Sequence, residues 1–159
     1  MDVDLNELGV EGLVAEFMTI DIPIKLEEGA KQPDRGHDYD AGLDLYANVE
    51  SEKVVSTGEV LQVHTGVSMA IPDGYFGMIC ERSSMGAKGL AVRGGIIDST
   101  YRGEIRVLIH NLSQNDYLIN NGDKIAQIII LPCSQTRLEV VDLLDETERG
   151  DKGFGSTNT

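Results

Sequence analysis

Apolar and polar residues alternate with a period of two along much of the chain, which is the pattern of β-strands that bury one face. The alternation begins with Ile20, Ile22 and Ile24. Pro23 places this first strand at a sheet edge, because proline has no N–H to donate to a neighbouring strand. Further strands are predicted at 43–47, 60–64, 67–71, 75–80, 104–110, 124–131 and 138–144.

Turn residues separate these strands at short intervals, as in Pro72-Asp73-Gly74 and in residues 120–123. Within 104–110, the isoleucines and the valine face one way and the polar residues face the other. The run 128–131 is apolar at every position, which predicts a strand buried on both faces. Many short strands, glycine-rich turns and little helix predict an all-β fold, a jelly-roll-like barrel or sandwich.

The two ends differ from the strand-rich middle. Residues 1–18 are acidic, and their partly helical apolar spacing is weakened by Gly9 and Gly12, so we predict an N-terminal extension. Residues 19–145 are long enough for one β-barrel domain with its own core. Residues 146–159 are polar and glycine-rich, which is typical of a flexible C-terminal arm.

Charge narrows the classes of partner. The 159 residues include 27 Asp and Glu against 13 Lys and Arg, a net charge of −14. Such a surface repels nucleic-acid phosphates and anionic membranes, so we expect neither as a partner. An anionic substrate would need a local cluster of cationic groups and backbone N–H groups, or a divalent cation.

The sequence also indicates where the protein is located in the cell and what its two cysteines do. No run approaches the roughly 20 apolar residues of a membrane helix. The acidic N-terminus lacks the basic start of a signal peptide, so we expect an intracellular, cytoplasmic protein that is not secreted. Cys80 and Cys133 cannot make a disulfide framework, and their apolar surroundings predict buried small side chains.

Four polar, glycine-rich clusters interrupt the strands, and a fifth lies in the C-terminal arm. The second and the fifth each combine an arginine, small hydroxyls and glycines. Glycines let backbone N–H groups approach an anion, hydroxyls donate hydrogen bonds, and arginine matches phosphate oxygens bidentately. The five clusters are 40–45, 82–86, 94–103, 122–127 and 149–157.

In this order and at these intervals, the five clusters resemble the motifs of the homotrimeric dUTPase family, the deoxyuridine triphosphate nucleotidohydrolases. The resemblance spans about residues 20–157. Its most specific parts are Gly-Ile-Ile-Asp-x-x-Tyr-Arg-Gly from Gly95 and Arg-Gly-x-x-Gly-Phe-Gly-Ser-Thr from Arg149. It implies a jelly-roll homotrimer with active sites shared between subunits. The implied reaction converts dUTP to dUMP and pyrophosphate with Mg²⁺, which limits uracil in DNA and supplies dUMP for dTMP synthesis.

The resemblance assigns the third cluster to the nucleoside and to the reacting water. Asp98 matches the aspartate that deprotonates a water for attack on the α-phosphorus. Tyr101 matches the tyrosine that packs on the deoxyribose and excludes a 2′-hydroxyl. The residues by themselves leave a turn-capping aspartate and a core tyrosine open as alternatives. The other positions implied to contact substrate are Gly95, Ile96 and Ile97, whose backbone would bind the uracil edge, and Arg106.

The first, second and fourth clusters are assigned to the triphosphate. Asp44 matches the aspartate that holds a water on Mg²⁺, an ion that keeps several waters and takes few protein ligands. A structural turn or an interface ion pair is the alternative for Asp44. The positions implied to contact the phosphates are Arg82, Ser83, Ser84 and Gln127.

The fifth cluster is implied to close over the bound nucleotide, with Phe154 on the uracil and Arg149 on the γ-phosphate. Two positions depart from the family pattern, because Lys152 and Asn158 stand where glycine is usual. The effect of these two residues on how tightly the arm closes stays open. The remaining arm residues assigned to substrate are Gly155, Ser156 and Thr157.

Three other functions compete with this interpretation. A related dCTP deaminase would need a glutamate ten residues after the aspartate, where this chain has Leu108. A nucleotide-gated regulatory protein without turnover conflicts with an intact Asp98 and a complete arm, although a second role stays open. A purely structural jelly roll leaves Asp98, Tyr101 and Phe154 unexplained.

Overall fold

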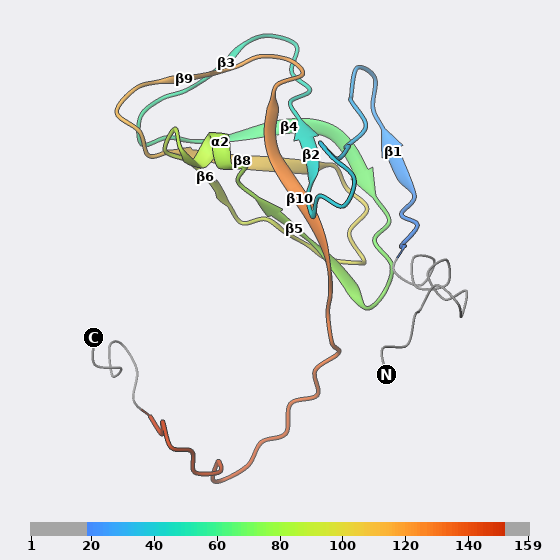
Figure 1. The fold of residues 1–159 in the computed structure, drawn as a ribbon, viewed down its shortest axis with the longest axis vertical. Coiled ribbons are helices and arrows are strands. Elements are labelled where there is room, and N and C mark those ends of the chain that lie inside the picture. The colour runs from blue at the N-terminus through green and yellow to red at the C-terminus, as the bar shows by residue number, and fades with distance from the viewer. Residues whose placement is uncertain (1–18, 152–159) are drawn as a thin grey trace, which may run out of the picture.

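A computed structural model describes residues 19–151 and shows an all-β fold, which confirms the predicted class (Figure 1). One sheet has the order β1-β4-β8-β6, a second has the order β2-β10-β5-β7, and β3 pairs with β9. The elements are β1 (Ile24–Leu26), β2 (Leu43–Tyr46), β3 (Lys53–Val55), β4 (Val60–Met69), β5 (Tyr75–Cys80), α2 (Ser83–Gly86), β6 (Leu90–Arg93), β7 (Ile96–Ile97), β8 (Ile105–Asn111), β9 (Tyr117–Ile119) and β10 (Lys124–Pro132).

Alternating side chains of the strands form one apolar core. In β8, the prediction is confirmed: Ile105, Val107 and Ile109 are buried, whereas Arg106 is exposed. β8 lies between β4 and β6, so both of its edges are paired, and its inward side chains belong to the core. Burying such side chains contributes about 1.5–3 kcal/mol each. The largest fully buried side chains from the rest of the chain are Leu45, Ile71, Ile119, Ile125 and Ile128.

A β-bulge joins two stretches that the pattern separates. The predicted strands 60–64 and 67–71 form one strand, β4, whose pairing with β8 shifts register between His64 and Val67. Gly66 has φ +66°, and a Cβ there would lie 2.5 Å from the Asn48 side chain. The bulge therefore requires glycine at position 66, and its two extra residues, Thr65 and Gly66, interrupt the apolar alternation between Val63 and Val67.

Two predicted strands need correction. The alternation at 20–24 forms a strand only from Ile24 onward, although β1 is an edge strand as Pro23 indicates. The strand predicted at 138–144 is wrong, since the segment is irregular and Leu138 and Val140 are 89% and 99% exposed. Alternation makes a strand only where a partner supplies hydrogen bonds, and no strand of residues 19–151 pairs with this segment.

Burial differs from expectation at the end of β10. Ile128 is fully buried, but Ile129 and Leu131 are half-buried, so this stretch is covered fully on one face only within a single chain. Cys80 is half-buried and Cys133, just after β10, is exposed, so the expected burial of Cys133 is wrong. Between residues 19 and 151, no helix has the length and apolar character needed to cross a membrane.

The predicted boundaries of the three segments stay predictions. The N-terminal extension, 1–18, lies outside the described residues, and so do the arm residues from Lys152 onward. The described part of the arm, 146–151, is exposed and has no strand or helix.

Candidate functional site

One pocket of about 440 Å³ gathers six of the predicted site residues. It lies where the segment that links β6 to β7 passes from β8 to β5. Asp98 and Tyr101 are both exposed residues of its wall. The other predicted residues that line it are Gly95, Ile96, Ile97 and Arg106.

Gly95 allows the chain between β6 and β7 to approach β5. Its φ is +100°, and its carbonyl accepts a 2.7 Å hydrogen bond from the Ile79 N–H. A Cβ at this position would lie 2.8 Å from the Ile79 carbonyl oxygen, closer than side chains come to backbone. Only glycine fits here, and β7 then pairs with Gly77 and Met78 of β5 and ends directly before Asp98.

A short turn orients Tyr101. Its N–H donates to the Asp98 carbonyl at 3.0 Å, and its hydroxyl donates to the Glu104 carbonyl at 3.0 Å. A Cβ on Gly103 would lie 2.5 Å from the Tyr101 hydroxyl and 2.6 Å from Cζ, so the ring lies directly over this glycine. With 45% of its surface exposed, Tyr101 is not a core tyrosine.

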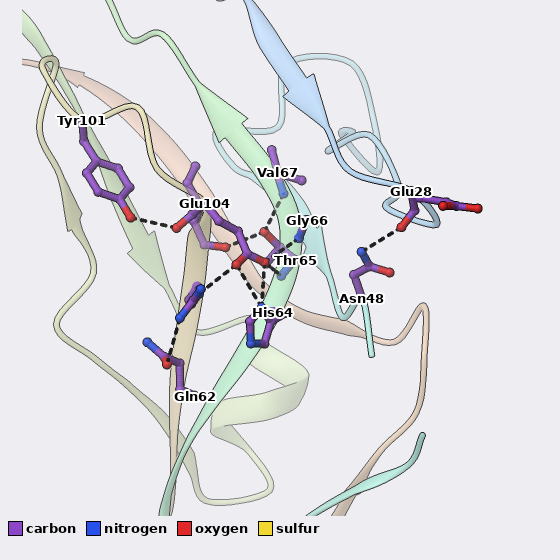
Figure 2. Close-up of polar contacts among 11 residues, drawn as sticks. Glu28, Asn48, Gln62, His64, Thr65, Gly66, Val67, Tyr101 and Glu104 are labelled. Carbon is purple, nitrogen blue, oxygen red and sulfur yellow. Dashed lines mark hydrogen bonds and ion pairs between the residues drawn. The ribbon is translucent and has the colours of Figure 1, made fainter. Parts of the chain in front are cut away.

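Glu104 connects the pocket to the β4 bulge, and the sequence analysis missed it (Figure 2). Its side chain is 9% exposed and accepts hydrogen bonds from Arg106 Nε at 2.8 Å and His64 Nδ1 at 2.9 Å. Burial raises the pKa of Glu104, but the hydrogen bonds from Arg106 and Gly66 and the nearby His64 outweigh it and lower the pKa below its ordinary value. The carboxylate is therefore ionised at neutral pH.

No local signal marks Glu104, because His64 and Gly66 lie 40 and 38 residues away in the sequence. Arg93 is a second residue of the pocket wall that the sequence analysis did not assign. Its Nε donates to Nδ1 of His110 at 3.0 Å.

A second cluster lies across the β2-β10-β5 sheet. The strand register puts Asp44 opposite Gln127, and Gln127 opposite Cys80. Asp44 Oδ1 accepts from Arg82 Nε, and its Oδ2 pairs with Lys124 Nζ, both at 2.7 Å. The hydrogen bond to Asp44 raises the pKa of Lys124. Two cations around one carboxylate give this cluster a net positive charge in an acidic protein.

The other residues of the second and fourth motifs surround this cluster. Gln127 Nε2 donates to the Glu81 carbonyl at 2.9 Å, and a Cβ on Gly42 would overlap the Gln127 amide. Ser83 and Ser84 begin α2 and are exposed, with Ser84 Oγ 3.4 Å from Arg82 Nη1. None of these residues lines the 440 Å³ pocket, so one chain carries two separate halves of the predicted site.

Asp44 fits a magnesium site in which substrate phosphates and water supply most of the ligands better than a site built from protein ligands alone. Within residues 19–151, no group of three or more His, Cys, Asp or Glu side chains could hold a metal ion. Both Asp44 oxygens already pair with cations of the same chain, Arg82 and Lys124. Mg²⁺ next to Asp44 would take its remaining ligands from substrate phosphates and water, the arrangement this ion prefers.

The arm residues are only partly placed. Arg149 is exposed and does not line the 440 Å³ pocket. The positions predicted to contact substrate at Phe154, Gly155, Ser156 and Thr157 lie outside the described residues.

Comparison with known proteins supplies the family. The dUTPase family model matches residues 28–158. The deoxyuridine 5′-triphosphate nucleotidohydrolase of Anaplasma marginale is 47% identical over 122 residues, which are 75% of this chain and 83% of that protein. The enzyme of the same name from Paramecium bursaria Chlorella virus 1 is 42% identical over 134 residues, covering 84% and 94% of the two chains.

Solved structures agree with the fold. The dUTPase of Staphylococcus bacteriophage 80alpha, solved with dUpNHpp, superposes with a TM-score of 0.81 at 29% identity, covering 89% of this chain and all (100%) of that one. A variant dUTPase of S. aureus phage phi11, which coordinates a structural Mg(II) ion, superposes with a TM-score of 0.72 at 27% identity, covering 80% and 100%. The family model and these relatives together place the chain in the dUTPase family, enzymes that hydrolyse dUTP.

Proposed function

We propose that the chain converts dUTP to dUMP and pyrophosphate, with Asp98 as the general base. The observation that carries this proposal is the pocket that Asp98 lines together with Tyr101 and the segment 95–97. In that position, the Asp98 carboxylate would accept a proton from the water that attacks the α-phosphorus, and pyrophosphate would leave. The water oxygen would remain on dUMP as the new phosphate oxygen.

Recognition of the nucleoside would come from the same pocket. Gly95, Ile96 and Ile97 line one wall of the pocket, where their peptide groups would bind the uracil edge. The Tyr101 ring lies over Gly103, and its hydroxyl donates to the Glu104 carbonyl. In this position the ring would pack against C2′ of the deoxyribose. A ribonucleotide would bring its 2′-hydroxyl against this ring and find no hydrogen-bond partner.

The triphosphate would bind the cationic cluster. Arg82, Ser83, Ser84 and Gln127 supply donors there, and Lys124 adds a second cation beside Asp44. Asp44 would hold Mg²⁺ through water, and the ion would neutralise charge on the three phosphates. This arrangement would offset the repulsion between a protein of net charge −14 and its anionic substrate.

A homotrimer would bring the two half-sites together. The pocket and the cationic cluster share no residue within one chain, and in a trimer the cluster of a neighbouring subunit would complete the site at the pocket. The half-buried Ile129 and Leu131 and the exposed 138–144 segment offer apolar surface for such contacts. The arm 149–157 would close over the nucleotide. We further propose that the enzyme acts in the cytoplasm, where it would limit uracil in DNA and supply dUMP.

Pyrophosphate release from dUTP, dCTP, dTTP and UTP tests the proposal, each with Mg²⁺ and with a chelator. We expect rapid release from dUTP alone, and a large loss when the chelator is added. The dTTP reaction tests exclusion of the methyl group, and the UTP reaction tests exclusion of the 2′-hydroxyl. Tight dUTP binding without release would contradict the enzymatic function and favour a nucleotide-gated regulatory protein.

Replacement of Gly103 by alanine tests the role of Tyr101. The added Cβ would push against the far end of the ring, which moves more easily than the backbone does. We expect thermal stability within a few degrees of wild type, and a ratio of UTP to dUTP turnover raised by about tenfold, the cost of a modest loss of fit. The measurement compares kcat/KM for both nucleotides. An unchanged ratio with a displaced Tyr101 ring would show that the tyrosine does not select the sugar.

A further inference from the structure

We infer that Glu104 is a positioning residue that holds the guanidinium of Arg106 at the wall of the nucleotide pocket. The β4 bulge fixes the carboxylate, and the carboxylate fixes Arg106. This inference rests on the proposed function in one respect, since it takes Arg106 to contact the substrate. It adds a chain of contacts from a strand irregularity to the pocket.

The contacts of Glu104 indicate positioning and exclude direct contact with substrate. Oε1 accepts from Gly66 N–H at 2.9 Å and from Thr65 N–H at 3.2 Å. Oε2 accepts from Arg106 Nε at 2.8 Å, and His64 Nδ1 lies 2.9 Å and 3.1 Å from the two oxygens. A carboxylate offers about four lone-pair sites, so these donors fill them. A ligand in the pocket would find no free acceptor on this side chain.

The bulge explains why two consecutive N–H groups reach one carboxylate. Thr65 and Gly66 have no partner in the β4–β8 ladder, which passes from the His64–Arg106 pair to the Val67–Ile105 pair. Thr65 Oγ1 donates to the Ile105 carbonyl at 2.5 Å and accepts from Val67 N–H at 3.2 Å, which closes the bulge. Glu104 satisfies the two N–H groups that the bulge releases, as Figure 2 shows.

Arg106 is held closely at Nε and more loosely at its terminal N–H groups. Its Nε is bound to Glu104, and its Nη1 lies 3.4 Å from Gln62 Oε1. Arg106 and Gln62 both line the pocket, and 42% of the Arg106 side chain is exposed. An arginine fixed by its Nε presents its terminal N–H groups in one orientation. Binding a ligand then costs less of the roughly 2 kcal/mol of rotamer entropy that a free arginine carries.

A double-mutant cycle tests the link through KM and kcat for dUTP. The variants are Glu104→Gln, Arg106→Gln and the two combined. Because the charge-assisted hydrogen bond that fixes Arg106 is weakened, we expect Glu104→Gln to raise KM about tenfold when Arg106 is present. In the Arg106→Gln background, the same change should raise KM less than about twofold. Because positioning precedes chemistry, kcat should change less than about threefold in each variant.

His64→Gln is the matched control, since His64 contacts the same carboxylate but does not line the pocket. We expect its KM to stay within about twofold of wild type. Equal effects of Glu104→Gln in both backgrounds would overturn the inference and assign Glu104 to the bulge alone. If Glu104→Gln does not fold, Arg106→Lys breaks the link from the other side, because lysine keeps the charge but lacks Nε. A wild-type KM for Arg106→Lys would then refute positioning.

An activity-independent measurement separates this inference from the proposed function. In ¹⁵N NMR, we expect the Arg106 Nε–H group of the wild-type protein to be as ordered as the backbone, and to become mobile in Glu104→Gln. A wild-type chain that releases no pyrophosphate, yet has an ordered Arg106, would refute the proposed function and leave the positioning intact. A mobile Arg106 in an active wild-type enzyme would refute the positioning and leave the function intact.

Discussion

Asp98→Asn is expected to lower kcat for dUTP by about 10²–10⁴, the range ascribed to a positioned general base. Asparagine has the size of aspartate and still forms hydrogen bonds with a water, but it cannot take the proton. The groups proposed to bind the base, the sugar and the phosphates are unchanged. We therefore expect the Kd for dUTP, measured by calorimetry, to stay within a few-fold of wild type.

Asp38→Asn is the control for Asp98→Asn. Asp38 is also an exposed aspartate, and it does not line the pocket that contains Asp98. Its variant carries the same change in net charge, so a general electrostatic effect on an anionic substrate would appear in both. Near-normal turnover of Asp98→Asn, or an equal loss in Asp38→Asn, would remove Asp98 from the reaction.

Truncation after Glu148 is expected to have the second large effect. It removes Arg149 and all of the fifth motif, including Phe154. Since several charge-assisted hydrogen bonds and a stacking contact would be lost together, kcat/KM should fall by a factor on the order of 10²–10³. The described residues from 141 to 151 are exposed, so thermal stability should change little. Stopped-flow or coupled pyrophosphate assays measure the rate, and calorimetry measures the melting temperature.

Truncation after Thr157 is the control, because it shortens the chain but keeps the fifth motif. It removes only Asn158 and Thr159 and keeps the Gly-Phe-Gly-Ser-Thr sequence. We expect its kcat/KM to match that of the full chain. An unchanged rate after truncation at Glu148 would show that the arm is dispensable, and a large fall in melting temperature would show that the arm stabilises the fold.

The alternating pattern identified the long strands because one face of each is covered by the core. In β8, Ile105, Val107 and Ile109 are buried, and the residues between them are more exposed, as the alternation predicts. The short strands β3, β6 and β9 were missed because three or four residues carry too little alternation to stand out from loops. Their pairing depends on partners distant in the sequence, such as Val55 with Tyr117.

The same limit explains the false strand at 138–144. Five of its seven residues are apolar and only Glu139 and Asp142 interrupt them, yet Leu143 and Leu144 are 86% and 79% exposed. Alternation records which side chains avoid water, and it does not record where the covering surface comes from. A neighbouring subunit would satisfy this pattern as well as a strand of the same chain would.

The sequence by itself determined the fold class, the family resemblance and the candidate residues, because alternation and contiguous motifs are local properties. Only the tertiary structure decided that Gly95 to Asp98, Tyr101 and Arg106 line one pocket, and that Asp44, Arg82 and Lys124 form a separate cationic cluster. It also brought Glu104 to Gly66, 38 residues away. Such contacts depend on strand register and on a bulge, which arise from the packing of the whole chain and have no local signature.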